Sequence, residues 1–316
     1  ELLELAGRTD LDVGDIRLEY GQSNGSDELR ARIAALYPGA TDASVLVTVG
    51  GVEANFTTFW HLFEREGSAA VLVPTYGQVP GLLESFGAHV VPVDLLESEG
   101  WQPDLDALER ALEGGARFVL VTNPNNPTGA ALTRDSMDAI VDLTGRHGAW
   151  ILADEVYGGA EREGEQTPSF WGAHDRVMVT NSLSKAYGLP GLRLGWIVAP
   201  PALALEMWGR TDYTTISPNS VSDVLARVAL DPDTRPKILA RTRGIVRRNL
   251  GVLTEWMDAQ DGRFSYRLPD AGAICYTRYH ADVNSTEFAE KLRTEKGLLT
   301  VPGDHFGMDR YLRIGF

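Results

Sequence analysis

The chain has 316 residues, of which 43% are hydrophobic and 23% charged, a composition typical of a globular protein and a length that suits two lobes. Its formal net charge of −15 argues against a nucleic-acid backbone as partner. The single cysteine, Cys275, excludes an internal disulfide and favours a reducing, cytoplasmic compartment, and the lack of a run of about 18 apolar residues predicts no membrane span.

The first two hundred residues alternate short apolar runs with helical patterns. The apolar runs are rich in Val, Leu and Ile, as expected of strands covered on both faces, and they predict strands at 45–49, 69–73, 117–122, 150–154, 177–181 and 194–199. The patterns between them predict helices at 52–64, 105–113 and 134–147. Strands that alternate with helices indicate a mostly parallel α/β sheet with right-handed crossovers.

After about residue 200 the pattern changes. Helices are predicted at 201–210, at 285–295, and over 220–259 with a break near Asp231-Pro232. Strands are predicted at 273–278, 298–301 and 311–316. These elements indicate a smaller α+β lobe. The domain prediction is therefore a large α/β domain at 45–205, extending to about 220, and a small α+β domain at 1–44 and 221–316.

Two polar segments follow predicted strands. Asn126 lies in the segment 123–129, and Asp154 ends the next strand, with Tyr157 three residues later. Ligands of α/β proteins bind at the carboxyl ends of the strands, so these side chains are candidate binding residues. The carboxylate and the phenol could each contact a different edge of one aromatic ring. The simpler alternatives are a stiff turn and a helix N-cap aspartate.

Lys185 lies among small hydroxyl residues and glycines, with Ser182 and Ser184 before it and Arg193 eight residues later. Small neighbours allow a flat cofactor to approach an amine, and hydroxyls with a guanidinium can hold a phosphate. This segment therefore predicts a Schiff-base lysine beside a phosphate site.

Two further features suit anionic groups. The turn Gly50-Gly51-Val52 opens a predicted helix and offers backbone N–H groups to an anion. Arg313 is a charge within an apolar predicted strand, where a buried guanidinium needs an anionic partner. A structural salt bridge is the alternative for Arg313 taken alone.

In this order and spacing, these segments resemble the fold-type I, class I/II aminotransferases of the aspartate aminotransferase superfamily, which use pyridoxal 5′-phosphate (PLP). The resemblance runs from about Tyr20 to Arg313. It implies the PLP-transferase fold type I, an α/β fold with a mostly parallel seven-stranded sheet between helices and a smaller α+β domain.

The resemblance also implies roles for residues around the cofactor ring. By this reading Lys185 forms the Schiff base and moves the proton between the substrate Cα and the cofactor's C4′. Asp154 keeps the pyridine nitrogen protonated, which makes the ring an electron sink. Tyr157 and Asn126 hydrogen-bond the ring's 3′ oxygen, and Tyr76 packs against the ring face.

For the phosphate, the resemblance implies contacts from the helix-opening turn, from the segment around the lysine and from a tyrosine of a neighbouring subunit. These residues are Gly51, Val52, Ser182, Ser184, Arg193 and, from the neighbour, Tyr20. Val52 stands where many relatives carry Ser or Thr, so one side-chain contact is missing. Arg313, helped by Asn126, clamps the α-carboxylate of the substrate.

The resemblance therefore predicts an aminotransferase that converts an L-amino acid to its 2-oxo acid through Schiff-base and quinonoid intermediates, in a homodimer with shared active sites. The main rival is a PLP-dependent lyase, cyclase or oxidase that uses the same quinonoid, and a binding module without catalysis is a third hypothesis. No histidine pairs with another His or a Cys at metal-ligand spacing, so we expect no metal site.

Overall fold

The computed structural model of the chain describes residues 1–8, 11–63 and 67–316. An eight-stranded sheet in the order β1-β8-β7-β6-β5-β2-β3-β4 forms its centre. Its strands are β1 (Val45–Thr48), β2 (Ser68–Val73), β3 (His89–Leu96), β4 (Gln102–Pro103), β5 (Phe118–Thr122), β6 (Trp150–Asp154), β7 (Val177–Ser182) and β8 (Gly195–Val198). Neighbours from β7 to β3 run parallel, whereas β8 and β4 are antiparallel to their neighbours. The mostly parallel α/β fold is thus confirmed.

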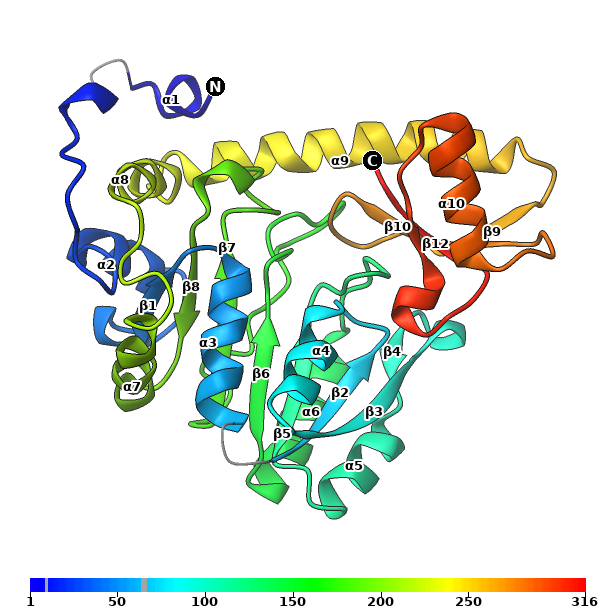
Figure 1. Ribbon diagram of the computed structural model, residues 1–316, viewed down its shortest axis with the longest axis horizontal. Coiled ribbons are helices and arrows are strands. Elements are labelled where there is room, and N and C mark those ends of the chain that lie inside the picture. Colours follow the sequence, from blue (N-terminus) through cyan, green and yellow to red (C-terminus); the bar gives the residue numbers. More distant parts are fainter. Residues whose placement is uncertain (9–10, 64–66) are drawn as a thin grey trace.

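Helices cover both faces of this sheet (Figure 1). One core lies under α3 (Gly51–Phe63), α4 (Gln78–Ser85) and α7 (Pro201–Thr211). The other lies under α5 (Leu105–Glu113) and α6 (Arg134–His147). Because successive strand residues point to opposite faces, each buried strand supplies both cores in alternation. In β5, for example, Leu120 joins the core under α3, and Val119 and Val121 join the other.

Local sequence explains where these helices begin and end. α6 begins at Arg134 because the Thr133 hydroxyl accepts a hydrogen bond from Ser136 N at 3.1 Å, and it ends where Gly148 takes a left-handed φ of 63°. In the same way, Asp104 caps α5 by accepting from Ala107 N at 2.8 Å.

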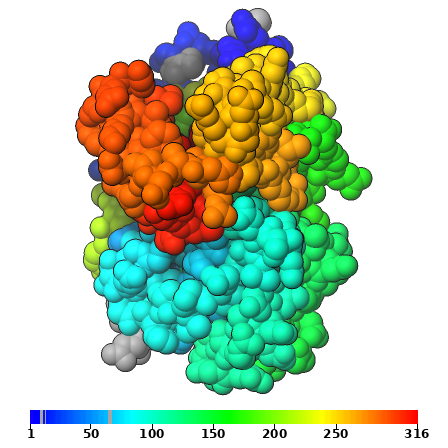
Figure 2. Space-filling model, turned by 90° about the vertical axis from the view of Figure 1, so that its right-hand side faces the viewer, coloured from blue at the N-terminus to red at the C-terminus, as the bar shows by residue number. Residues whose placement is uncertain are grey.

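The C-terminal residues form a second, antiparallel sheet in the order β11-β12-β10-β9. Its elements are β9 (Phe264–Tyr266), β10 (Ile274–Tyr279), α10 (Ser285–Lys296), β11 (Val301–Pro302) and β12 (Tyr311–Gly315). The helix α9 (Arg235–Asp258), about 36 Å long at 1.5 Å per residue, runs above the large sheet toward this second sheet (Figure 1). Figure 2 shows the orange and red C-terminal residues seated on the cyan and green layer of the large sheet.

Residues before β1 add α1 (Leu2–Ala6) and α2 (Asp27–Ala34). α2 packs on α8 (Ser220–Ala229) and beside β1. Its buried residues Leu29 and Ile33 belong to the same core as α5 and α6. None of the helices described is long and apolar enough to cross a membrane.

The observed bounds agree closely with the predicted ones in the first half of the chain. Each of the six predicted large-sheet strands is found within one residue at each end, and the helices predicted at 105–113 and 134–147 are exact. The helix predicted at 52–64 is α3, although residue 64 lies outside the described residues.

Some expectations need correction. The sheet has eight strands rather than seven, because a two-residue edge strand, β4, pairs with β3. β3, α1, α2 and α4 were not predicted, and the strand predicted at 298–301 begins only at Val301. The helical region 220–259 divides into α8 and α9, with the predicted break between them at 230–234.

A substitution of Phe63 tests how much the packing of α3 on the sheet contributes to stability. Its side chain is fully buried and meets the ring of Phe118 edge-on at a centroid distance of 4.6 Å. Phe63→Ala should lower the free energy of unfolding by about 3–5 kcal/mol, since it leaves a cavity. Urea unfolding monitored by circular dichroism measures this loss. Phe56→Ala, in the same helix at a half-buried position, is the matched control and should cost clearly less; equal losses would contradict the packing described.

Candidate active site

Three polar positions meet at the carboxyl edge of neighbouring strands. Asp154 ends β6, Ser182 ends the adjacent β7, and Asn126 follows β5 on the other side of β6. Parallel strands bring their carboxyl ends to one edge, so residues far apart in sequence are neighbours here. Lys185 lies three residues after the end of β7.

Asp154 is held by uncharged hydrogen-bond donors. Its carboxylate accepts from Asn55 Nδ2 at 3.0 Å and from Val156 N at 3.1 Å. The buried Asn55 accepts in turn from the Thr180 hydroxyl at 2.6 Å, which fixes the orientation of its amide. Burial raises the pKa of Asp154 above its ordinary value, and the two donors and the charge of Lys185 oppose that rise.

Asn55 and Thr180 were not predicted from the sequence as members of the site. The available signal was a polar pair at buried positions: Asn55 lies one turn into α3 beside the buried Ala54, and Thr180 lies inside an apolar strand. A buried amide requires a partner, and here that partner is the carboxylate that the sequence had singled out.

Lys185 opens on a cavity of about 220 Å³ between the large sheet, α9 and β10. Its lining includes Tyr157, Ser184, Thr242, Gly272 and Ile274. Partial burial lowers the pKa of Lys185 below its ordinary value, the positive charges of Arg313 and Arg193 lower it further, and Asp154 opposes them. The amine is therefore neutral at a lower pH than an exposed lysine would be.

The ring of Tyr157 forms a wall of this cavity and is buried. A Cβ on Gly272, which has a φ of 80°, would lie 2.7 Å from Tyr157 Cδ1, so only glycine lets the segment before β10 approach the ring so closely. Burial raises the pKa of Tyr157 to about 12, and the charge of Arg313 counteracts part of that rise. The phenol therefore remains a hydrogen-bond donor at neutral pH.

An anion cradle forms where α3 begins. Its N-terminus lies at Gly51, beside the hydroxyl of Ser182: a Cβ on Gly51 would be 3.5 Å from Ser182 Oγ. A Cβ on Gly50 would lie 2.6 Å from Arg193 Nη2, so the guanidinium reaches the turn only because residue 50 is glycine. Ser182 Oγ accepts from Ser184 N at 3.2 Å, which leaves its own hydrogen to donate. Helix N-terminus, hydroxyl and guanidinium together suit a phosphate.

Arg313 comes to the same place from the second sheet. It lies in β12 opposite Tyr276 of β10, and its Nη1 donates to Asn126 Oδ1 at 3.0 Å. This contact joins two residues that are 187 positions apart in sequence. The remaining N–H groups of Arg313 are available to a ligand carboxylate.

The other predicted positions differ in their surroundings. Tyr76 follows β2, is 37% exposed, and lies near enough to Tyr157 to affect its pKa. Val52, in the first turn of α3, is 50% exposed and offers no polar side chain to the cradle. Tyr20 is 80% exposed on the segment that leads into α2, and the structure does not bring it to the other members. Its role stays a prediction.

Comparison with known proteins gives a consistent result. The chain matches the family model described as aminotransferase class I and II over residues 6–316. It is 32% identical over 312 residues to capreomycidine synthase of Streptomyces vinaceus, a match that covers 99% of this chain and 79% of that protein.

Two solved structures are similar over nearly the whole chain. The crystal structure of a PLP-dependent aminotransferase from Streptococcus suis has a TM-score of 0.93 at 32% identity and covers 100% of this chain and 84% of that one. The PLP-dependent cyclase OrfR has a TM-score of 0.89 at 26% identity and covers 99% and 84%.

This site combines an anion cradle, a lysine whose pKa is lowered and, near that lysine, the Asp154 carboxylate. Such a combination suits an enzyme that holds a phosphorylated aldehyde cofactor. The chain belongs to the aminotransferase class I and II family and is a PLP-dependent enzyme of fold type I. The residues fit that cofactor, because the cradle would meet its phosphate and the Asp154 carboxylate, whose hydrogen-bond donors are neutral, suits a cationic ring nitrogen.

Asp154→Asn separates the stability of the cofactor-free protein from its affinity for PLP. The raised pKa means that the folded state keeps a proton that the unfolded state has already lost, so the free energy of unfolding falls as the pH rises through that window. Without PLP, Asp154→Asn should therefore melt above the wild type at pH 8, with the difference shrinking toward pH 4.

With PLP added, the order should reverse, because a neutral amide gives up the attraction to the ring nitrogen, and ligand stabilisation follows affinity. Thermal melting with and without saturating PLP measures both effects. An equal stabilisation of the two proteins by PLP would contradict the role of Asp154.

Proposed function

We propose that the protein is an aminotransferase that converts an L-amino acid to its 2-oxo acid and passes the amino group to a second oxo acid. The observation that carries the proposal is that Asp154 and Arg313, from separate parts of the chain, lie close enough to Lys185 for their charges to affect its pKa. The family match supports the same reaction. PLP, when bound, supplies the electron-withdrawing ring that accepts the electron pair left by proton removal at Cα.

Lys185 is both the attachment point for the cofactor's aldehyde and the base. Its lowered pKa raises the neutral fraction of the amine, so Nζ can take the Cα proton of the substrate and return it elsewhere. Asp154 stabilises the positive charge on the ring nitrogen, and the Asn55–Thr180 chain keeps its carboxylate in place. Tyr157 and Asn126 would bond the ring oxygen, and Tyr76 would lie against the ring face.

Arg313 orients the substrate. Its guanidinium would bind the α-carboxylate through the N–H groups that Asn126 does not use. A carboxylate fixed at one end leaves the Cα–H bond free to point at Lys185, so proton removal is favoured over loss of CO₂. The cradle at Gly51, Val52, Ser182, Ser184 and Arg193 would hold the phosphate.

The proposal includes a homodimer in the cytoplasm. Its sites would be shared, with Tyr20 of one subunit meeting the phosphate held by the other, and the exposure of Tyr20 supports this. The two sheets support a division into a large domain at 45–205, extending to about 220, and a small one at 1–44 with 221–316.

A second reaction shares these residues. Capreomycidine synthase and the cyclase OrfR have names that do not describe amino transfer, and both resemble this chain throughout. The alternative is therefore a PLP-dependent lyase, cyclase or oxidase that acts on an amino acid. Incubation with a panel of amino acids and pyruvate, followed by mass spectrometry, distinguishes them. Alanine formed in equal amount with a new 2-oxo acid supports transfer, whereas ammonia, a cyclised product or peroxide refutes it.

Lys185→Ala should lower turnover by at least about 10²–10⁴-fold, the usual contribution of a positioned acid–base group, and should abolish the visible absorption of lysine-bound PLP. Absorbance spectra and steady-state kinetics measure these losses, and circular dichroism checks the fold. Lys237→Ala, at an exposed position in α9, is the matched control and should behave as wild type. Turnover retained by Lys185→Ala would disprove the assignment.

Arg313→Lys should raise KM for the amino acid by roughly tenfold or more with a smaller change in kcat, because lysine cannot form two parallel hydrogen bonds to a carboxylate. Arg278→Lys, exposed on the neighbouring strand β10, is the control. Initial-rate kinetics over a range of amino-acid concentrations measure both constants, and an unchanged KM in Arg313→Lys would contradict the clamp.

A further inference from the structure

The segment 19–26, here called the Tyr20 arm, has a fixed base. Gly25 has a φ of 93°, and a Cβ there would lie 2.3 Å from Val47 Cγ2, so the arm packs directly on β1. Asn24 O accepts from Val47 N at 3.1 Å, and Ser23 Oγ accepts from Trp208 Nε1 at 2.9 Å. The second half of the arm is therefore tied to the edge of the large sheet and to α7.

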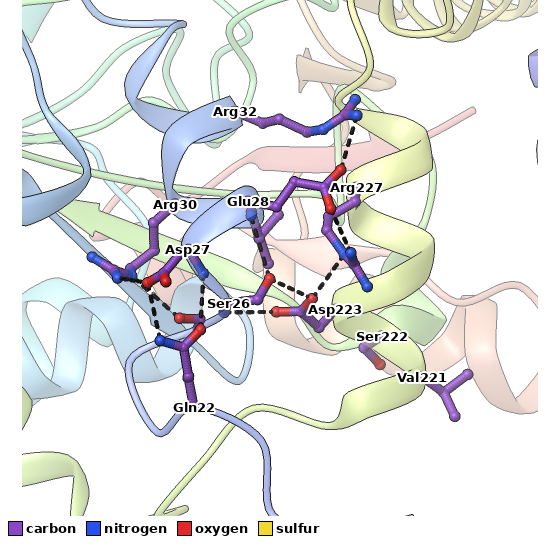
Figure 3. A network of polar contacts seen from close by, with 12 residues as sticks. Gln22, Ser26, Asp27, Glu28, Arg30, Arg32, Val221, Ser222, Asp223 and Arg227 are labelled. Carbon is purple, nitrogen blue, oxygen red and sulfur yellow. Dashed lines mark hydrogen bonds and ion pairs between the residues drawn. The ribbon is translucent and has the colours of Figure 1, made fainter. Parts of the chain in front are cut away.

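The first turn of α8 holds both ends of the arm. Ser220 Oγ donates to Glu19 O at 2.9 Å, next to Tyr20. At the other end, Ser26 donates twice to Asp223, from N at 3.0 Å and from Oγ at 2.7 Å (Figure 3). Asp223 is only 8% exposed, and Arg227 Nε lies 3.1 Å from its carboxylate. A largely buried carboxylate that accepts two hydrogen bonds from one residue and lies beside a guanidinium gives a rigid junction.

Tyr20 is presented to solvent from this rigid base. Its side chain is 80% exposed, and that of Leu18, two residues before it, is 86% exposed. On a fixed backbone only the side-chain rotamers have to be ordered on binding, and a tyrosine has just two χ angles, which is typical of contact residues. The arrangement is that of an interaction surface rather than of a loose terminus.

The loop that precedes α8 has a strained conformation. Ile216, a β-branched residue, has a φ of 66° and is 46% exposed. Such strain persists only where the surroundings enforce it, and here the hydroxyls of Thr214 and Thr215 both donate to Glu53 Oε1 at 2.6 Å. Glu53 is in the first turn of α3, so the loop that leads into α8 is hydrogen-bonded to the helix that opens the cradle.

The cradle has room for a donor from outside the chain. Val52 is half-exposed on its rim and has no polar side-chain atom, so a bound phosphate would face solvent on that side. A phosphate has three strong acceptor oxygens, which a phenol O–H of a second copy can help to satisfy.

We propose that Asp223, together with Ser220, is a positioning residue that presents Tyr20 to the cofactor site of a second copy of this chain. The proposal rests on the proposed PLP-dependent function and its shared sites, and it adds that each site depends on the first turn of α8 in the other subunit. Asp223 does not touch the cofactor. Its effect passes through Ser26 and the arm.

Subunit mixing tests this proposal, with PLP fixed onto Lys185 by borohydride as the readout. Asp223→Ala alone should raise the PLP dissociation constant by about tenfold, the equivalent of one hydrogen bond of about 1.4 kcal/mol. Asp223→Ala subunits are then mixed with Lys185→Ala subunits, which lack the amine and carry an intact arm. Random pairing makes half of the dimers mixed, each with one complete site, so tight reducible sites should return to about a quarter of the wild-type number.

Two controls separate the possible failures. Tyr20→Ala subunits mixed with Lys185→Ala subunits test the shared site itself. Asp231→Asn is the matched control, because it breaks the 2.8 Å Arg32–Asp231 ion pair between α2 and the segment after α8. Asp231→Asn should bind PLP as wild type does. If Asp223→Ala does not fold, Ser220→Ala replaces it in the mixture, since it removes only the bond to Glu19 O.

Three outcomes overturn the proposal. Wild-type PLP affinity in both Asp223→Ala and Ser220→Ala shows that the arm needs no positioning. Tight sites that return with Tyr20→Ala but not with Asp223→Ala show that Asp223 acts within its own subunit, and the proposed shared site survives. Tight sites that return with neither variant refute the shared site together with the proposal built on it.

Discussion

The proposed chemistry of this protein depends on a carboxylate whose hydrogen-bond donors are neutral. Asp154 sits at the end of a buried strand, and Asn55 and the Val156 amide orient it without cancelling its charge. A carboxylate in that state has a raised pKa, and a cation that comes next to it stabilises it. With the proposed roles, a positively charged ring beside Asp154 would balance this charge, and binding and activation of the cofactor would rely on the same interaction.

The order of the strands brings the remaining groups to that carboxylate. β7 and β5 flank β6, so the lysine segment and Asn126 approach the ring position from its two sides. Arg313 reaches it from the second sheet and contacts Asn126 directly. A substrate bound between the two sheets would bridge them. Any relative movement of the sheets would change the distance between Arg313 and Lys185, and with the proposed roles it would couple substrate binding to the geometry of proton transfer.

The elements that the sequence predicted well are those with one dominant signal. Apolar runs located the central strands, and the polar motifs at their ends predicted the candidate site. β3 was missed because Pro92 and Asp94 interrupt its pattern, and an exposed strand near the edge tolerates both. Asn55 was missed because its partner lies 99 residues away, and only the fold brings them together. Tyr20 could be singled out only by resemblance, because its proposed contact lies in another subunit.

The close approach of Gly50, Gly51 and Gly195 limits which residues can replace them. A Cβ on Gly195 would lie 2.5 Å from the carbonyl carbon of Gly50 and 2.6 Å from the nitrogen of Gly51. Both obstacles are main-chain atoms, which cannot rotate away as a side chain does. Other side chains can therefore replace Val52 on the rim, but a side chain at Gly195, on the floor of the cradle, would force the main chain to move. If the cradle holds a phosphate as proposed, the main chain alone fixes the shape of its floor, and the side chains at the rim remain the part that substitution can change.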